Sequence, residues 1–303
     1  MNQSSIKKIK TVVAGYGNVG RYAVQAVMTA PDMELCGIVE PFAPVNAPEL
    51  PSVPLVKDIT GLEKADVAIL CLPSRSVEEF AVSCLNKGIN TVDAFDIHGD
   101  ILEFKKNLDR AAKQGNARAV ISAGWDPGTD SVIRALLEAS APKGITYTNF
   151  GPGMSMGHSV AVKAIKGVVN ALSVTIPTGA GVHRRMVYVQ LSSGVKFDEI
   201  SAVIKADPYF VHDETHVIQV DNLDDYLDVA HGVSLERRGT SGITSNQNFQ
   251  FSMRINNPAL TSQILVSAAR AALRQAPGAY TLLEIPVIDL LPGDRDSIIH
   301  RLA

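Results

Sequence analysis

The stretch TVVAGYGNVG, residues 11–20, sets the architecture of the first part of this chain. An apolar run of strand character leads into the glycine pattern G-x-G-x-x-G, and a helical pattern follows at once. Gly15 permits the tight turn, Gly17 lets the backbone approach a pyrophosphate, and Gly20 lets the helix pack closely on the strand. The unpaired N–H groups of the helix N-terminus attract the anion. The stretch therefore predicts a dinucleotide site, the alternative being a glycine-rich turn without a ligand, and its residues are Gly15, Tyr16, Gly17, Asn18, Val19 and Gly20.

The following hundred or so residues alternate short strand-like runs with longer helical patterns. Strands are predicted at Ile9–Ala14, Met33–Val39, Val67–Leu72, Asn90–Asp93 and Ala119–Ala123, and helices at Val19–Thr29, Val77–Asn86 and Ile101–Lys113. Runs such as Val67–Leu72 are apolar throughout, as a strand buried on both faces requires. The pattern predicts an α/β fold, a Rossmann-type doubly wound parallel sheet.

The pattern of apolar and polar residues changes after about Trp125. Apolar and polar residues alternate at Met186–Leu191 and Phe249–Ile255, which is typical of half-exposed strands in an antiparallel or mixed sheet. Pro258–Gln275 has helical spacing and returns the chain to the first part. We therefore expect a dinucleotide-binding domain of residues 1–123 rejoined by 258–303, and a second α+β domain of residues 124–257, built on a mixed sheet, for substrate binding and dimerisation.

The composition narrows the class of protein. The chain has 303 residues, 46% hydrophobic and 19% charged, with a formal charge of −3, so disorder and a general attraction to nucleic acid or anionic membranes are excluded. Cys36, Cys71 and Cys84 suggest neither a disulfide framework nor a zinc site, and we expect no metal. This cysteine usage fits a reducing cytoplasm best, and no apolar run is long enough for a membrane span. The expected partner is a small-molecule substrate.

Glu40 affects which of the two dinucleotides, NAD or NADP, the sequence favours. It follows the second strand, about twenty residues beyond Gly20, where an acidic side chain accepts hydrogen bonds from both ribose hydroxyls of NAD. A 2′-phosphate would be repelled there, and no Arg lies in the loop from Glu40 to Val56. Taken alone these residues favour NAD over NADP. The alternative is that Glu40 points to solvent.

Three loops at the carboxyl ends of predicted strands are candidates to present a substrate to the nicotinamide: Pro73–Ser76, Asp93–His98 and Gly124–Gly128. Each follows a buried strand. Structural roles compete with functional ones, since Asp93 and Asp96 could cap a helix or close a turn, and Asp126 before a proline could cap the next helix.

Five motifs together carry a resemblance: GYGNVGRY, TVDAFDIHGD, SAGWDPGTDS, TNFGPGMSMGHS and RINNPALT. Over nearly its whole length the chain resembles the meso-diaminopimelate dehydrogenases, in the shorter type that lacks an insertion in the substrate domain. The resemblance implies reversible NADP-dependent oxidative deamination at the D-centre of meso-2,6-diaminopimelate, which gives L-2-amino-6-oxopimelate and ammonia in lysine and diaminopimelate metabolism. It also implies a cytoplasmic homodimer without a metal.

The resemblance assigns roles to residues of this chain. Asp96 and Asp126 hold the reacting D-amino group, with Asp96 the better candidate to accept its proton. Trp125 and Phe150 shape the walls. The loop of residues 151–159, with Met156, Gly157 and His158, binds the carboxylate at the reacting end. At the L-centre the implied contacts are Thr175, Arg185, His231 and Asn257, and the implied cofactor contacts beyond the glycine loop and Glu40 are Ser74, Arg75 and Ser76.

The chain departs from the family's sequence pattern at one place, and several alternative functions stay open. Family members usually carry Arg or Ser-Arg after the second strand to hold the 2′-phosphate, whereas this chain has Glu40-Pro41-Phe42-Ala43, so we expect NADP with NAD also used. A sugar oxidoreductase of similar architecture would carry Glu-Lys-Pro where this chain has Asp93-Ala94-Phe95-Asp96. A related enzyme for another D-amino acid and a non-catalytic nucleotide sensor are the remaining rivals. His158, His231 and Arg185 could each be structural.

Overall fold

The computed structural model describes residues 8–40, 52–59, 65–226 and 231–303, and these form two compact units. The first unit contains the described residues up to Val132 together with Pro258–Ala303, and the second contains Ile133–Asn257. The second unit thus begins later than the residue 124 that the sequence suggests. The loop after residue 123 stays with the first unit because its backbone is hydrogen-bonded there, with Ala123 N donating to the Asp93 carbonyl.

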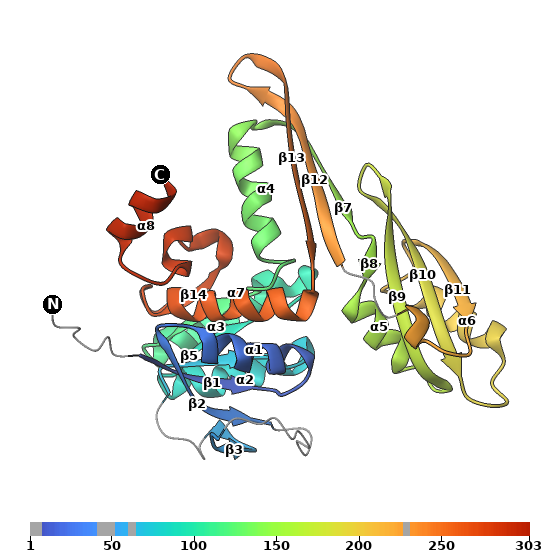
Figure 1. Cartoon of the computed structure of the whole chain (residues 1–303), viewed down its shortest axis with the longest axis horizontal. Coiled ribbons are helices and arrows are strands. Elements are labelled where there is room, and N and C mark those ends of the chain that lie inside the picture. The colour runs from blue at the N-terminus through green and yellow to red at the C-terminus, as the bar shows by residue number, and fades with distance from the viewer. Residues whose placement is uncertain (1–7, 41–51, 60–64, 227–230) are drawn as a thin grey trace. The chain divides into compact units, whose positions relative to one another are not determined.

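The first unit is built on a seven-stranded sheet, shown with its helices in Figure 1. The spatial order β14-β6-β5-β4-β1-β2-β3 has every neighbouring pair parallel. Its elements are β1 Ile9–Ala14, α1 Asn18–Thr29, β2 Met33–Val39, β3 Leu55–Val56, β4 Val67–Leu70, α2 Ser74–Asn86, β5 Asn90–Asp93, α3 Ile101–Gln114, β6 Arg118–Ile121, α7 Asn257–Ala272, β14 Gly278–Thr281 and α8 Arg295–Leu302.

Each face of this sheet is covered by its own hydrophobic core, as the apolar strands predict. Val12 and Ala14 of β1 pack into the cluster that α2 and α3 cover. Val13, between them, points to the opposite face and joins the cluster formed by α1 and α7. Successive side chains of a strand alternate between faces, so a run without polar residues fills both cores. The predicted fold class is confirmed.

Helix α7 ties the end of the chain to its beginning. Alanines 268, 269, 271 and 272 are fully buried, and such small side chains let the helix lie close to its neighbours. Ser262 Oγ donates to the Val19 carbonyl of α1 at 2.7 Å. The buried guanidinium of Arg270 donates from Nη2 to Asp32 Oδ1 at 2.7 Å, just before β2. The return of the chain predicted from the helical pattern is therefore found.

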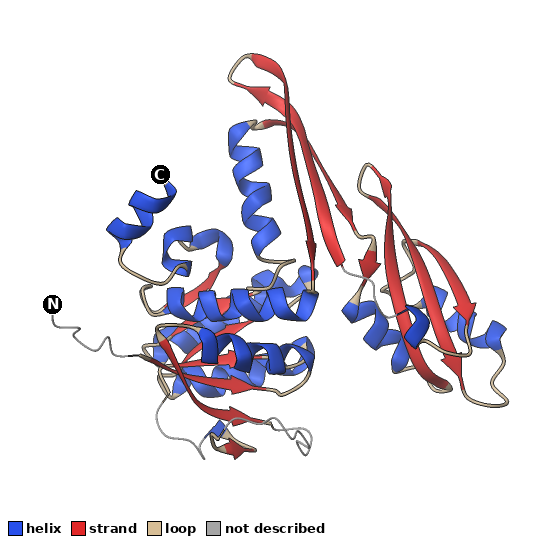
Figure 2. Ribbon diagram, viewed as in Figure 1, coloured by secondary structure: helices blue, strands red, loops and turns tan. Residues whose placement is uncertain are grey.

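The second unit contains two sheets, visible as separate groups of strands in Figure 2. Its elements are α4 Thr129–Ser140, which begins in the first unit, β7 Lys143–Phe150, β8 Gly153–Met154, α5 Met156–Lys163, β9 Val168–Gly179, β10 Val182–Leu191, α6 Phe197–Ala206, β11 Glu214–Gln219, β12 His231–Ser241 and β13 Thr244–Ile255. The sheet β11-β10-β9-β8 is mixed, because β10 pairs parallel with β11 and antiparallel with β9. The sheet β13-β12-β7 is antiparallel.

Several predicted bounds differ from those observed. Helix α2 begins at Ser74, three residues before the predicted Val77, and β4 ends at Leu70, before the predicted Leu72. Most of the loop from Glu40 to Val56 falls on residues 41–51, which lie outside the described residues. Within the part of the chain that the structure describes, no helix has the length and apolar character of a membrane span.

Candidate active site

The glycine loop after β1 is held by close backbone contacts. Gly15 has φ +90°, and a Cβ there would lie 2.4 Å from the Cys71 carbonyl oxygen. A Cβ on Gly20 would lie 1.9 Å from the Gly15 carbonyl oxygen. Beside Gly17, in contrast, a Cβ would meet no described atom within 4 Å, so the backbone there faces open space. These are the three positions that a phosphate-cradling turn needs: a left-handed turn, a close helix crossing and an accessible backbone.

Helix α1 begins directly after this loop. Gly17 is its N-cap and makes no side-chain cap, and the first turn of the helix carries no acidic residue. The N–H groups at this end are therefore available to an anion, and their partial positive charge favours one.

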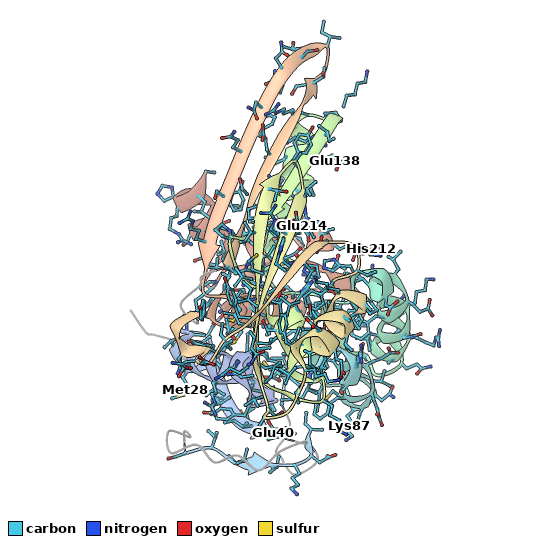
Figure 3. The ribbon with its side chains drawn as sticks, turned by 90° about the vertical axis from the view of Figure 1, so that its right-hand side faces the viewer. Met28, Glu40, Lys87, Glu138, His212 and Glu214 are labelled. Carbon is cyan, nitrogen blue, oxygen red and sulfur yellow. The ribbon has the colours of Figure 1, made fainter. Side chains whose placement is uncertain are left out.

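Glu40 turns towards the glycine loop. The N–H of Tyr16 donates to Glu40 Oε2 at 2.7 Å, and Glu40, labelled in Figure 3, directly follows β2. The alternative that Glu40 points away into solvent is therefore wrong. The guanidinium carbon of Arg21, on α1, lies 5.7 Å from the centre of the Tyr16 ring.

Asp96 and Ser74 are brought together from two loops. Ser74 Oγ donates to Asp96 Oδ1 at 2.7 Å, and the Asp96 N–H donates back to Ser74 Oγ at 3.3 Å. Ser74 is the first residue of α2, and Asp96 follows β5, the strand next to β4. Asp96 and the neighbouring Arg75 are exposed, whereas Ser74 and Ser76 are half-buried. A predicted cofactor residue and the predicted proton acceptor thus form one hydrogen-bonded pair.

Asp93 is a buried carboxyl group at the carboxyl end of β5, three residues before Asp96. The sequence did not single it out as functional. Its Oδ1 accepts from the Phe95 N–H at 3.0 Å and from the Ser122 N–H at 3.1 Å. Burial raises the pKa of Asp93 to about 7. The two N–H donors favour the charged form and lower the pKa, but burial has the larger effect. The contacts join the loop that carries Asp96 to the end of β6, before Asp126. The turn role considered for Asp93 is thus found.

The loop between β6 and α4 presents Trp125 and Asp126. Trp125 is buried and Asp126 is half-buried. The Gly124 N–H donates to the Pro127 carbonyl at 3.1 Å, which closes the loop on itself. Helix α4 begins at Thr129, so Asp126 is not its N-cap. Helix α3 has Asp100 as its N-cap, so the capping alternative is also wrong for Asp96.

In the second unit, Arg185 is held by two side chains. Its Nε donates to Asp213 Oδ2 at 2.6 Å, and its Nη1 donates to Thr175 Oγ1 on the paired strand β9. The Arg185 side chain is 13% exposed and Thr175 is fully buried. Among the described residues, Nη2 of Arg185 has no hydrogen-bond partner. Asp213 is a residue that the sequence analysis missed.

His158 lies near this arginine and is uncharged at neutral pH. Burial, reinforced by the positive charge of Arg185, lowers the pKa of His158 to about 4. Its Nδ1 shares a hydrogen bond of 2.7 Å with Ser155 Oγ, and its ring meets the edges of Tyr209 and Phe210. The surroundings of His158 are those of a fixed neutral imidazole.

The remaining predicted residues of the second unit lie at strand and helix ends. Phe150 ends β7, and its N–H donates to His183 Nε2 at 2.7 Å. A Cβ on the next residue, Gly151, would lie 2.2 Å from the Thr175 carbonyl oxygen, and the Gly151 N–H donates to the Gly232 carbonyl beside His231. The structure therefore gathers Phe150, Thr175 and His231. Met156 and Gly157 open α5, His231 is buried at the start of β12, and Asn257 opens α7.

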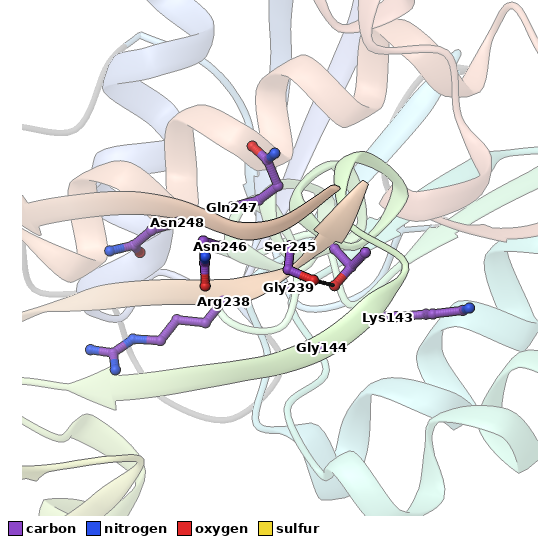
Figure 4. A pocket seen from close by; sticks show the side chains of 9 residues that line it. Lys143, Gly144, Arg238, Gly239, Ser245, Asn246, Gln247 and Asn248 are labelled. Atoms are coloured by element: carbon purple, nitrogen blue, oxygen red, sulfur yellow. Dashed lines mark hydrogen bonds between the residues drawn. The ribbon is translucent and has the colours of Figure 1, made fainter. Parts of the chain in front are cut away.

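A shallow hollow of about 660 Å³ lies elsewhere in the second unit (Figure 4). It is formed by the start of β7 and the turn between β12 and β13, and its lining consists of Lys143, Gly144, Arg238, Gly239, Thr240, Ser245, Asn246, Gln247 and Asn248. No predicted site residue lines it. In the described ranges, no three His, Cys, Asp or Glu side chains are grouped as metal ligands would be.

A parallel doubly wound sheet with this glycine loop, and with carboxylates after the strands that follow it, defines a dinucleotide-dependent oxidoreductase. The profile of the diaminopimelic acid dehydrogenase C-terminal domain matches residues 124–257. A meso-diaminopimelate D-dehydrogenase of Bacteroides fragilis is 59% identical over 298 residues, which cover 98% of this chain and 100% of that protein. The chain belongs to the meso-diaminopimelate D-dehydrogenase family, and the resemblance is confirmed.

Solved structures agree with this assignment. The C. glutamicum DAP dehydrogenase in complex with DAP is 28% identical, with a TM-score of 0.88 over 98% of this chain and 100% of that one. An engineered D-amino acid dehydrogenase bound to NADP+ is also 28% identical, with a TM-score of 0.86 and the same coverage of both chains.

Asp93 makes the stability of the first unit depend on pH. Between its ordinary pKa of 3.8 and about 7, the folded state holds a proton that the unfolded state has released. The free energy of unfolding therefore falls as the pH rises through this window and levels off above it, by roughly 4 kcal/mol as an upper bound. Asp93→Asn keeps the acceptor oxygen but does not ionise, so its stability relative to the wild type should rise across the window.

Urea unfolding at a series of pH values measures this difference. Asp100→Asn, which removes an exposed carboxylate of the same loop region, is the matched control and should show no such trend. A stability difference between Asp93→Asn and the wild type that is the same at every pH would contradict the prediction.

Proposed function

We propose that this chain catalyses the reversible NAD(P)-dependent oxidative deamination of the D-centre of meso-2,6-diaminopimelate to L-2-amino-6-oxopimelate and ammonia. The observation that carries the proposal is the Ser74–Asp96 pair, which sets an acceptor carboxylate beside the start of α2, at the edge of the sheet where the glycine loop lies. Ligands of such sheets bind at this edge. Membership of the family supplies the substrate, and lysine biosynthesis is the corresponding metabolism.

Asp96 and Asp126 act on the reacting amino group. Both carboxylates bind the ammonium form, and Asp96 accepts a proton from it, which frees the nitrogen lone pair. That pair forms the C=N bond as the α-hydrogen leaves as hydride, and NADP+ held at the glycine loop would supply the hydride acceptor. Water then adds to the imine carbon and ammonia departs. Ser74 donates to Asp96 Oδ1 throughout, so it holds the carboxylate in one orientation.

Residues of the second unit bind the two carboxylates of the substrate. Arg185 keeps Nη2 for a ligand, because Asp213 and Thr175 occupy Nε and Nη1. It grips the carboxylate at the L-centre, where a guanidinium is suited by its planar set of donors. His231 and Asn257 complete this end. Backbone N–H groups near Met156 and Gly157, with neutral His158 beside them, take the carboxylate at the reacting end, and Trp125 and Phe150 form the walls.

The protein acts as a homodimer in the cytoplasm. Strand β13 forms an edge of the three-stranded sheet, and along the described residues it pairs only with β12. An uncovered edge strand of this length invites pairing or coverage by another chain. Cys36, Cys71 and Cys84 are free thiols, which fits a reducing compartment.

Asp96→Asn tests the proton acceptor. The amide keeps an oxygen to accept from Ser74 but cannot take up the proton, so kcat for meso-diaminopimelate should fall by about 10²- to 10⁴-fold. Reduction of the nicotinamide, followed by its absorbance, gives the rate. Asp100→Asn serves as the control and should retain the wild-type rate. Unaltered turnover in Asp96→Asn would remove Asp96 from the mechanism.

Arg185→Lys tests the grip on the far carboxylate. Lysine keeps the charge but loses the planar donor set and the contact from Nε to Asp213, so KM should rise roughly 10- to 100-fold with a smaller change in kcat. Arg184→Lys is a matched control, because Arg184 precedes it on β10 and pairs with exposed Glu214, labelled in Figure 3. Equal effects of the two substitutions on KM would argue against the role of Arg185.

The homodimer is tested by the mass in solution. Light scattering after size exclusion should give twice the 32.4 kDa of one chain, because a partner covers the exposed sheet of the second unit. Hydrogen exchange should then be slow in Thr244–Ile255. A mass of a single chain at all protein concentrations would refute the dimer.

A further inference from the structure

The end of strand β7 is held by a side chain from the other sheet of the second unit. Strand β7 is an outer strand of the sheet β13-β12-β7, and among the described residues of that sheet it pairs with β12. The Gly151 N–H donates towards β12, to the Gly232 carbonyl at 2.8 Å. Successive N–H groups of a strand point to opposite sides, so the N–H of Phe150 is directed away from β12. It donates to Nε2 of His183, on β10, at 2.7 Å.

His183 contacts the ring of Phe150 as well as its backbone. The two ring centres are 5.6 Å apart, and the rings are tilted by 36°. A second contact joins the same two segments, since the Gly181 N–H, just before β10, donates to Asn149 Oδ1 at 2.9 Å. The start of β10 therefore fixes both the backbone and the side chain at the end of β7.

The contact with Phe150 determines the protonation state of His183. A backbone N–H can only donate, so Nε2 must accept and carries no proton. The one proton of the neutral ring is therefore on Nδ1. An imidazolium has a proton on both nitrogens and cannot accept a hydrogen bond, so protonation of His183 removes the acceptor from the Phe150 N–H.

The surroundings of His183 favour this neutral form. Burial and the positive charge of Arg185 lower the pKa of His183 from its ordinary value of 6.5, and the negative charge of Asp213 opposes them. Strand β9, which pairs with β10, carries no titratable side chain. On the other strands packed against β10, the titratable side chains are those of Lys143, Tyr147, Glu214 and His216.

We infer that His183 is a positioning residue for substrate binding, whose neutral ring holds Phe150 in place and releases it when Nε2 takes up a proton. The role of Phe150 as a wall of the site, beside the loop that begins at Gly151, rests on the proposed function. The hydrogen bond and the position of the proton do not, because they belong to the second unit by itself. The effect is expected on KM, since Phe150 shapes a wall and transfers no proton.

Two substitutions at His183, assayed for KM of meso-diaminopimelate between about pH 5 and pH 8, test the inference. His183→Leu removes the acceptor and should raise KM about tenfold at neutral pH. His183→Gln supplies an acceptor that does not titrate, so KM should stay near the wild-type value at neutral pH. On acidification KM of the wild type should rise, and the rise should be smaller in His183→Gln.

His216→Gln is the matched control, the same change at an exposed histidine of β11, and it should keep the wild-type profile. A wild-type KM in His183→Leu would overturn the inference. So would an acid rise in His183→Gln equal to that of the wild type.

Nitrogen NMR of the full chain labelled in its seven histidines tests the proton position without turnover. The signals missing from His183→Gln identify His183. They should show a proton on Nδ1 alone at neutral pH, and the Phe150 amide signal should shift when Nε2 becomes protonated. A neutral ring with its proton on Nε2 would refute the inference while leaving the proposed reaction intact. Absence of turnover with a proton found on Nδ1 would refute the reaction instead.

Discussion

Three stretches of backbone meet at the end of β1 with no room for a side chain between them. Gly15 lies against the carbonyl of Cys71 after β4, and Gly20 of α1 lies against the carbonyl of Gly15. A methyl group at either glycine would push the strand, the turn and the helix apart. This close packing fixes the carboxyl ends of β1, β2 and β4 relative to one another. The positions of Glu40, Ser74 and Asp96 follow from it.

The acids at this edge differ because their surroundings differ. Asp93 is fully buried and is given two backbone donors, so it holds two loops together and tends towards the neutral form. Asp96, three residues on, is exposed and paired with a hydroxyl, so it can meet a cationic substrate. Glu40 is tied to a backbone N–H of the glycine loop. Three carboxylates at the carboxyl ends of neighbouring strands therefore have three different surroundings, one buried, one exposed and one bound to the glycine loop.

Much of the first unit could be predicted because its strands are apolar on both faces and its turn requires glycine. The predicted bounds of β1, β2 and β5 are those observed. The start of α2 was missed, since the polar residues Ser74, Arg75 and Ser76 show no apolar periodicity. The second unit was predicted as one mixed sheet but has two, because alternation shows that a strand is half-exposed and not which strand it joins.

The residues of the candidate site could be proposed from the sequence only where a motif marks them. The aspartates 96 and 126 stand in unusual sequence contexts, and the capping roles that competed with them are excluded by where α3 and α4 begin. Asp213 lies in no motif. Its contact with Arg185 exists because β11 pairs in parallel with β10. This pairing brings together two residues that are 28 positions apart in the sequence. The burial of Asp93 likewise depends on β6, a later strand.

Helix α7 and strand β14 complete a sheet whose other strands come from the first part of the chain. The second unit is thus an insertion in the sequence of the first. During synthesis from the N-terminus, residues 133–257 emerge in full before Ser262 can reach the carbonyl of Val19. On the face that α1 and α7 share, the part that α7 covers stays exposed for that time. The unit that begins first is therefore finished last, and the glycine loop gains its final support only after the whole second unit has been synthesised.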